Sequence, residues 1–130
     1  MIQRIQSLYL LLLIICCTSG LFFLPPLELP ELTLSSEVLS DCYLFFSIIM
    51  SALALFIFKY RKVQLLINGI QLFVQMLVFV GFILVRMNVN TIAAFSPWLL
   101  MPILAIVFLL MSSRAIRKDE ALVRSIDRLR

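Results

Sequence analysis

Four amide side chains follow one another along an otherwise apolar stretch of this chain. Gln64, Asn68, Gln71 and Gln75 are spaced by four, three and four residues. At about 100° per residue this spacing places them within a stripe about 60° wide on one helical face, and Arg86 falls on the same face further along. An amide in so apolar a segment is costly unless it is hydrogen-bonded. The stripe is therefore expected to face protein or water rather than lipid.

Two interpretations of this polar face are open. In the first, the amides hold helices together by bonding to Ser47 and Ser51, an i, i+4 pair of small hydroxyl residues on the preceding apolar stretch that suits close helix approach. In the second, the face lines a groove that binds a lipid headgroup, a quinone-like molecule or a peptide segment.

The chain lacks the groups on which enzymes and ion pumps usually depend. It has four long apolar stretches, and none carries Asp, Glu, Lys or His in its middle, whereas ion-coupled and proton-coupled pumps normally place an ionisable group near the membrane midplane. It contains no histidine and only three glycines, and no nucleophile, zinc-binding or phosphate-binding motif occurs. We therefore expect no enzymatic activity, no catalytic or metal-binding residue and no cofactor.

The C-terminal segment is the second feature that could bind something. Leu122, Ile126 and Leu129 recur on one helical face, with Arg124 and Arg128 beside them. A basic amphipathic helix of this kind either lies on anionic lipid or docks on a membrane or cytoplasmic protein. Nucleic acid is not expected as a partner, because no aromatic residue accompanies the basic ones. The expected partners are the lipid bilayer and a protein, and a homo-oligomer is compatible with both.

The elements that must position these residues are membrane spans. Hydrophobic residues make up 63% of the chain, above the roughly 45–50% of soluble domains. About 20 apolar residues span a hydrocarbon core of about 30 Å, and four stretches come close to that length: residues 5–24, 39–58, 64–85 and 95–111. We predict an all-α membrane protein with four transmembrane helices in an antiparallel bundle (residues 1–112). The fourth helix is expected to continue into a cytoplasmic basic amphipathic tail (residues 113–130).

The distribution of charge predicts the orientation of these spans. Ten of the eleven Lys and Arg residues flank the side that holds both termini, and Arg86 alone lies on the other side. The loop after the first span has no Lys or Arg and carries four acidic residues, Glu28, Glu31, Glu37 and Asp41. By the positive-inside rule, both termini face the cytoplasm.

The first span and the cysteines favour plain structural roles. The first apolar stretch exceeds the roughly 7–15 residues of a signal-peptide core, which indicates a signal anchor. Cys16 and Cys17 lie in this span and Cys42 in the second. Their spacing matches no metal site and favours packing, although a disulfide from the first span to Cys42 is left open.

The connections between spans predict local geometry. The short segment Lys59–Lys62 predicts that the second and third helices pack as neighbours. Pro97 suits the first turn of the fourth helix, and Trp98 suits the outer membrane interface. Pro102 then predicts a bend or a widened turn in that helix.

The two ends of the chain resemble those of a known family. Its first residues are MIQRIQSLYL, and its last, from Arg114 to Arg130, are RAIRKDEALVRSIDRLR. These segments are similar to those of small bacterial inner-membrane proteins that consist of a four-span domain of unknown function, and the resemblance covers the whole length. It implies the four-span architecture and a multi-pass position in the inner membrane, and it implies no activity, substrate or catalytic residue. We predict a non-enzymatic accessory or scaffold protein, with a small-molecule or lipid carrier as the alternative.

Overall fold

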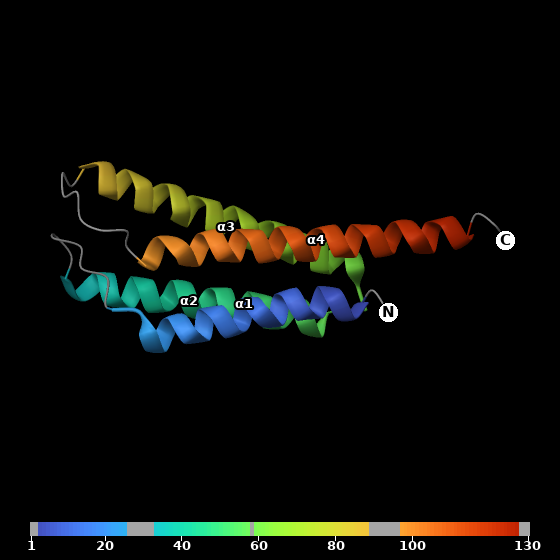
Figure 1. Cartoon of the computed structure of the whole chain (residues 1–130), viewed down its shortest axis with the longest axis horizontal. Helices are drawn as coiled ribbons and strands as arrows, with labels where there is room; N and C mark the ends of the chain where they lie inside the picture. The colour runs from blue at the N-terminus through green and yellow to red at the C-terminus, as the bar shows by residue number, and fades with distance from the viewer. Residues whose placement is uncertain (1–2, 26–32, 58, 89–96, 128–130) are drawn as a thin grey trace.

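The chain folds into four long helices, seen in a computed structural model that describes residues 3–25, 33–57, 59–88 and 97–127 (Figure 1). Helix α1 covers Gln3–Phe23, α2 covers Thr33–Phe56, and α3 covers Arg61–Asn88. A short 3₁₀ turn, Pro97–Leu99, leads into α4, which covers Leu100–Asp127. The described residues are otherwise connections, so the fold is all-helical, as expected.

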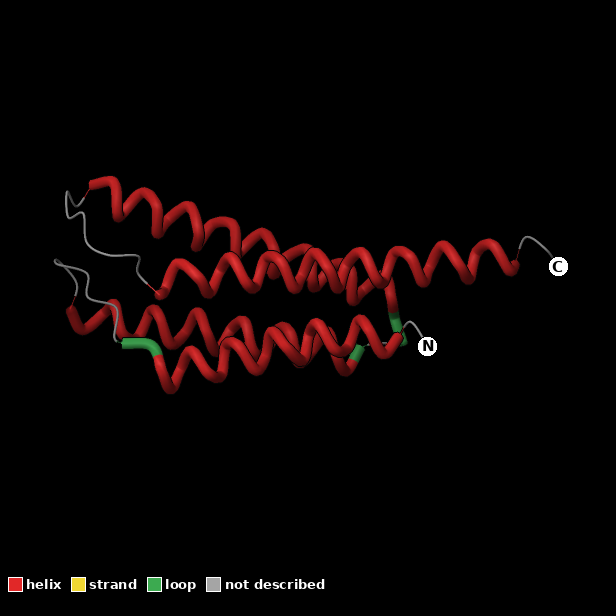
Figure 2. Tube along the Cα trace, viewed as in Figure 1, coloured by secondary structure: helices red, strands yellow, loops and turns green. Residues whose placement is uncertain are grey.

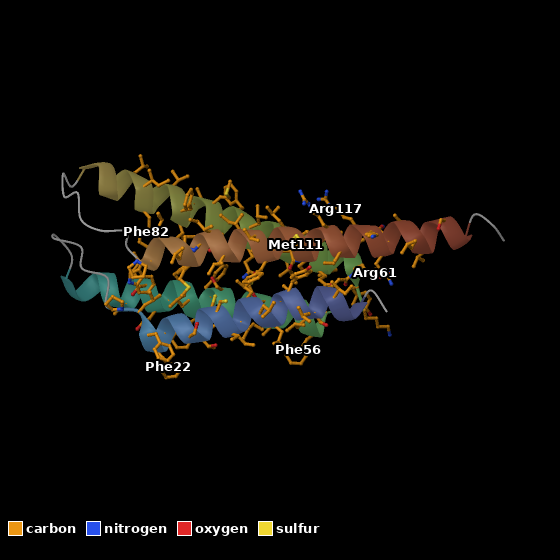
Figure 3. The ribbon with its side chains drawn as sticks, viewed as in Figure 1. Phe22, Phe56, Arg61, Phe82, Met111 and Arg117 are labelled. Carbon is orange, nitrogen blue, oxygen red and sulfur yellow. The ribbon has the colours of Figure 1, made fainter. Side chains whose placement is uncertain are left out.

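All four helices are long and apolar enough to cross a membrane. The interior holds both polar and apolar side chains, whereas the outer surface is largely apolar, unlike that of a soluble protein. Phe22 and Phe56, for example, are 84% and 82% exposed, and Figure 3 shows both rings pointing away from the bundle. Exposed apolar side chains on every helix fit contact with lipid. The architecture is that of a multi-pass membrane protein.

The helices pack in a ring in which α1 contacts α2 and α4, and α3 contacts α4. The contact between α2 and α3 is present but less extensive, so the predicted pairing of these two neighbours is the loosest in the ring. Figure 2 shows α1 beside α2 along most of their length, whereas α3 lies along α4 toward the end that holds the termini and separates from it toward the other end. The buried apolar cluster draws on several helices, and its members include Leu10, Leu13, Cys17, Leu44, Ala54, Ala105 and Leu109.

Gly20 marks a close approach between helices at one end of this cluster. A Cβ atom at Gly20 would lie 2.9 Å from Met101 Cε of α4 and 3.5 Å from Leu44 Cδ1 of α2. A residue without a side chain lets helices approach closely, which is how membrane helices gain packing energy. Gly69 and Gly81, by contrast, have no such neighbour within 4 Å.

The start of α4 shows one contact that the sequence did not predict and one difference from expectation. Trp98 is buried, 4% exposed, and its Nε1–H donates to the Pro25 carbonyl, just after α1, over 2.8 Å. Its expected depth at the outer membrane interface stays a prediction. Pro102 lies in the first turn of α4, where a helix leaves its N–H groups unpaired in any case. The structure has a tight 3₁₀ turn ahead of Pro102, not a widened one.

The first turns of α1, the short connection from α2 to α3 and the last turns of α4 lie toward the same end of the molecule (Figure 1). In the connection, the Tyr60 N–H donates to the Ile57 carbonyl over 3.0 Å. Helix α4 extends beyond the other three at this end. Its 28 residues correspond to about 42 Å, more than the roughly 30 Å of a hydrocarbon core.

The three cysteines are free. Cys17 is buried in the apolar cluster, Cys16 is half-buried and Cys42 is exposed. The disulfide that the sequence left open is not formed in this structure.

Candidate functional site

The amide side chains of α3 face the interior of the bundle. Gln64 is 2% exposed, and Asn68, Gln71 and Gln75 are fully buried. Their spacing of four, three and four residues puts them on the one side of α3 that meets other helices. We call these four residues the amide row. Arg86 also belongs to α3, but its side chain lies outside what the structure describes.

The middle of the amide row is bonded to α2. Gln71 Nε2 donates to the Ser47 carbonyl over 3.1 Å and to Ser51 Oγ over 2.9 Å. Gln75 Nε2 donates to Ser47 Oγ over 2.9 Å, and Gln75 Oε1 accepts a hydrogen bond from the Tyr43 hydroxyl. Both glutamines lie near the middle of the candidate span Arg61–Leu84. The partners expected from the sequence, Ser47 and Ser51, are thus present.

Ser51 also bonds to its own helix. Its hydroxyl donates to the Ser47 carbonyl, one turn earlier, over 2.8 Å, as buried helical serines commonly do. The Ser47 carbonyl therefore accepts two side-chain hydrogen bonds, one from Ser51 and one from Gln71. A side chain from each of the two helices thus meets at this carbonyl.

One turn nearer the α2–α3 connection, the amide row bonds to α4 instead of α2. Asn68 Nδ2 lies 3.3 Å from Ser112 Oγ of α4, and Ser112 is fully buried. The row therefore bonds to α2 in its middle and to α4 nearer the end that holds the chain termini, which ties three helices together.

Several buried polar atoms of this region have no hydrogen-bond partner within the described part of the chain. They are Gln64 Oε1, Asn68 Oδ1 and Gln71 Oε1 on α3, and Gln6 Nε2 on α1. Three of the four are acceptors, so the region has an excess of unpaired carbonyl oxygens. The site can thus accept hydrogen bonds from a donor that reaches it.

An ion pair joins α3 to α4 at this end of the bundle. Arg61 Nη2, at the first residue of α3, lies 2.8 Å from Asp119 Oδ2 on α4. One turn before Asp119, Ile116 is fully buried. The first part of the predicted tail is therefore packed against the bundle, and α4 passes through residues 112 and 113 without a break.

Beyond Asp119 the helix presents side chains to the outside. Leu122 and Val123 are 44% and 42% exposed. Arg117 and Lys118 are exposed as well, and Figure 3 shows Arg117 pointing away from the bundle. Arg124 and Ile126 belong to α4, but their side chains lie outside what the structure describes, as do Arg128 and Leu129 altogether.

Sequence reasoning missed three members of the polar interior: Gln6, Tyr43 and Ser112. Tyr43 precedes Ser47 and Ser51 at the same spacing of four residues, so the helical period alone could have found it. Ser112 and Gln6 carried no such signal, because their roles depend on which helices meet. Among the described residues no group of three or more His, Cys, Asp or Glu side chains gathers as metal ligands do.

Comparison with known proteins identifies a family and no activity. Neither a curated protein nor a solved structure matches the chain. The model of one family, described as "Domain of unknown function (DUF4293)", matches residues 2–129, nearly the whole chain. The resemblance of the two chain ends to a domain of unknown function is thereby confirmed. The chain belongs to the DUF4293 family.

Proposed function

We propose that this protein is a non-enzymatic accessory or scaffold subunit of a bacterial inner membrane. In this proposal four helices cross the bilayer as an antiparallel bundle, and both termini lie in the cytoplasm. The bundle acts by helix packing, and the end of α4 contacts a membrane or cytoplasmic protein.

The observation that carries the proposal is the way in which α4 is held. Ser112 meets Asn68, Ile116 is buried, and Asp119 pairs with Arg61. These contacts support the helix up to about residue 119, and the following turn leaves Leu122 and Val123 exposed. A helix fixed at its base and apolar at its end is pre-organised for docking, because little conformational entropy is lost on binding.

Two observations support the proposed orientation in the membrane: where the basic residues lie and the direction in which α4 extends. Arg61, Lys62, Arg117 and Lys118 lie at the end where α1 begins and α4 ends, and basic residues favour the cytoplasmic side. Helix α4 continues in line with the bundle (Figure 1). This favours a tail that projects from the membrane over one that lies flat on its surface.

A pair of experiments tests the proposal. A fluorescent reporter fused after residue 130 should be active, and alkaline phosphatase fused there should be inactive; phosphatase activity would overturn the orientation. A photo-crosslinking amino acid at position 122 should then join to one discrete protein in native membranes. The matched control is position 110, which is exposed to a similar degree, 43% against 44%, but lies in the apolar part of α4.

Loss of the adduct when Val123→Ser, which preserves all charges, is added to the chain that carries the crosslinking residue at position 122 would support docking through this end of α4. Equal crosslinking from positions 122 and 110, or an adduct unaffected by Val123→Ser, would contradict it.

A second candidate function is the binding or carriage of a small molecule or lipid, such as a quinone-like compound, at the amide row. It is favoured by the unpaired oxygens of Gln64, Asn68 and Gln71. Mass spectrometry of the protein released intact from native membranes tests it. A bound small molecule that is retained by the natural chain and lost in Gln71→Leu would support a carrier role.

A further inference from the structure

The unpaired oxygens of the amide row lie side by side on α3, and the orientation of at least one is fixed. Gln71 Nε2 faces the Ser47 carbonyl, which can only accept hydrogen bonds. Turning the Gln71 amide over would bring two oxygens together, so its nitrogen must point to Ser47 and its Oε1 must point elsewhere. That Oε1 is buried and unpaired, like Asn68 Oδ1 and Gln64 Oε1.

These oxygens need a donor that the described part of the chain does not supply. A buried polar group without a hydrogen bond costs roughly 1–3 kcal/mol in proteins, and more in a fully apolar medium. Lipid offers no donor in its hydrocarbon region. Three such groups within two helical turns would together cost a large share of a protein's stability. A bound ligand with hydrogen-bond donors removes that cost.

The spacing of the three oxygens limits which kinds of ligand can bond to them. The rise from Gln64 to Asn68 is about 6 Å and that from Asn68 to Gln71 about 4.5 Å, so these three residues span about 10 Å of α3. Oxygens that share one cation lie within about 5 Å of one another, because each is about 2.3–2.6 Å from the ion. One ion therefore cannot coordinate all three oxygens, whereas several separate hydrogen-bond donors in a row can bond to them.

The charge and polarity of the surroundings exclude further classes of ligand. The segment of α3 from residue 64 to residue 75 contains no acidic residue, and the Asp119 carboxylate is paired with Arg61. An ammonium group would thus lose its hydration without a counter-charge in the row. An oxidised quinone presents carbonyl oxygens, which are acceptors like those of the row, so only its reduced form, which carries hydroxyl groups, fits. Neutral O–H donors are the chemistry that remains.

We propose that the interior along Gln64, Asn68 and Gln71 is a binding site for neutral hydroxyl donors. Water and the hydroxyl groups of a small polyol are the two sources of this chemistry. The site is independent of the tail and of any docking partner. It ends at Gln75, whose Oε1 and Nε2 are both paired.

Nuclear magnetic resonance of the full chain in lipid nanodiscs tests the site. Magnetisation transferred from water protons or from the hydroxyl protons of added glycerol should reach the side-chain amides of Gln71 and Asn68. Gln75 is the matched internal control: it has the same side chain, is equally buried and lies one turn away, but its amide is satisfied. Transfer to Gln71 without transfer to Gln75 is the expected result. No transfer to Gln64, Asn68 or Gln71 would overturn the proposal.

Glycerol, added as the probe, separates the two sources. If water is the resident donor, transfer from water to Gln71 persists at all glycerol concentrations. If a polyol binds, this transfer is lost in a saturable way and a signal from glycerol replaces it. Either result supports a site for hydroxyl donors.

A variant provides a second readout. Asn68→Leu removes one unpaired oxygen with little change of side-chain size. If donors occupy the row, the melting temperature should fall, because both the Ser112 bond and the bond to the bound ligand are lost. A dry interior would lose the same Ser112 bond but would also be relieved of the unpaired oxygen, so an unchanged or higher melting temperature would overturn the proposal.

Discussion

The contact of α1 with α4 and the contact of α2 with α3 are built on different principles. The first is extensive and draws on apolar and small residues, among them Leu13, Cys17, Ala105 and Leu109. The second is less extensive, and four hydrogen bonds cross it, between Gln71 and Gln75 on α3 and Tyr43, Ser47 and Ser51 on α2. The first contact depends on how well apolar side chains fit together, and the second depends on the direction of its hydrogen bonds.

This difference matters because lipid is as apolar as leucine. Membrane helices gain little from burying apolar surface, so they associate by close packing and by hydrogen bonds. Packing by shape tolerates small shifts of one helix along another. A bond from Gln71 to the Ser47 carbonyl does not, because a shift of one residue turns the amide away by about 100°. The polar contact therefore fixes the register of α2 against α3.

The largest expected effect is at the apolar contact, with Leu109→Ala. Leu109 is fully buried, and removing its side chain leaves a cavity; because lipid is itself apolar, only the cavity part of the usual cost applies, on the order of 2–3 kcal/mol. Reversible unfolding in mixed micelles measures the change in the free energy of unfolding. Leu110→Ala, at a neighbouring position that is 43% exposed, is the control and should change it little. Equal effects at both positions would mean that α4 is not packed as described.

The next effect is expected where α1 and α4 approach most closely. Gly20→Leu should destabilise the bundle by about 1–3 kcal/mol through overpacking, because even a Cβ would lie 2.9 Å from Met101 Cε. Gly20→Ala should cost far less, since the end of the Met101 side chain can move. Gly69→Leu is the matched control, with open space around it. A Gly20→Leu protein as stable as the Gly69→Leu protein would contradict close approach at Gly20.

A smaller effect is expected at the polar contact. A double-mutant cycle of Gln71→Leu and Ser51→Ala should give a coupling energy of about 0.6 kcal/mol and no more than about 1.7 kcal/mol, the range measured for hydrogen bonds between membrane helices. The same micelle unfolding gives all four free energies. A coupling energy indistinguishable from zero would mean that the 2.9 Å contact between these residues adds nothing to stability, and that its role is confined to register.

The two contacts also differ in how well the sequence predicts them. The amide spacing predicted an inward face on α3, and Ser47 and Ser51 were foreseen as partners because small hydroxyls at i and i+4 form a pattern within one helix. The α1–α4 contact has no such pattern: Leu10, Leu13 and Leu109 resemble the exposed Leu8, Leu11 and Leu110 in type. In a membrane both faces are apolar, so periodicity does not separate lipid-facing from buried leucines.

Contacts between distant segments were the other limit of prediction. Trp98 was assigned to the interface from its residue type, and its bond to the Pro25 carbonyl depends on where α1 ends in space. The Arg61–Asp119 pair joins residues 58 positions apart, and nothing near either residue marks it. The family and the four spans could be predicted from the sequence, whereas the partners across helices required the fold.

The smallest effect is expected at this ion pair. Arg61 and Asp119 are 27% and 14% exposed, and pairs with such access to solvent contribute about 0–1 kcal/mol and weaken with salt. Asp119→Arg places two cations together and should loosen α4 beyond Ile116. Spin-label distances between positions 62 and 118 should broaden as a result, with little change in overall stability.

The charge-swapped double variant, Arg61→Asp with Asp119→Arg, provides the decisive control, because it restores attraction with the partners exchanged. Its spin-label distances should narrow again, and high salt should broaden them in the natural chain and in the swapped chain alike. If Asp119→Arg leaves the distances unchanged, the base of the projecting helix is held by Ile116 and Ser112 alone. The shape-based packing of α4 would then extend to the end of the bundle, and the ion pair would be an incidental neighbour of it.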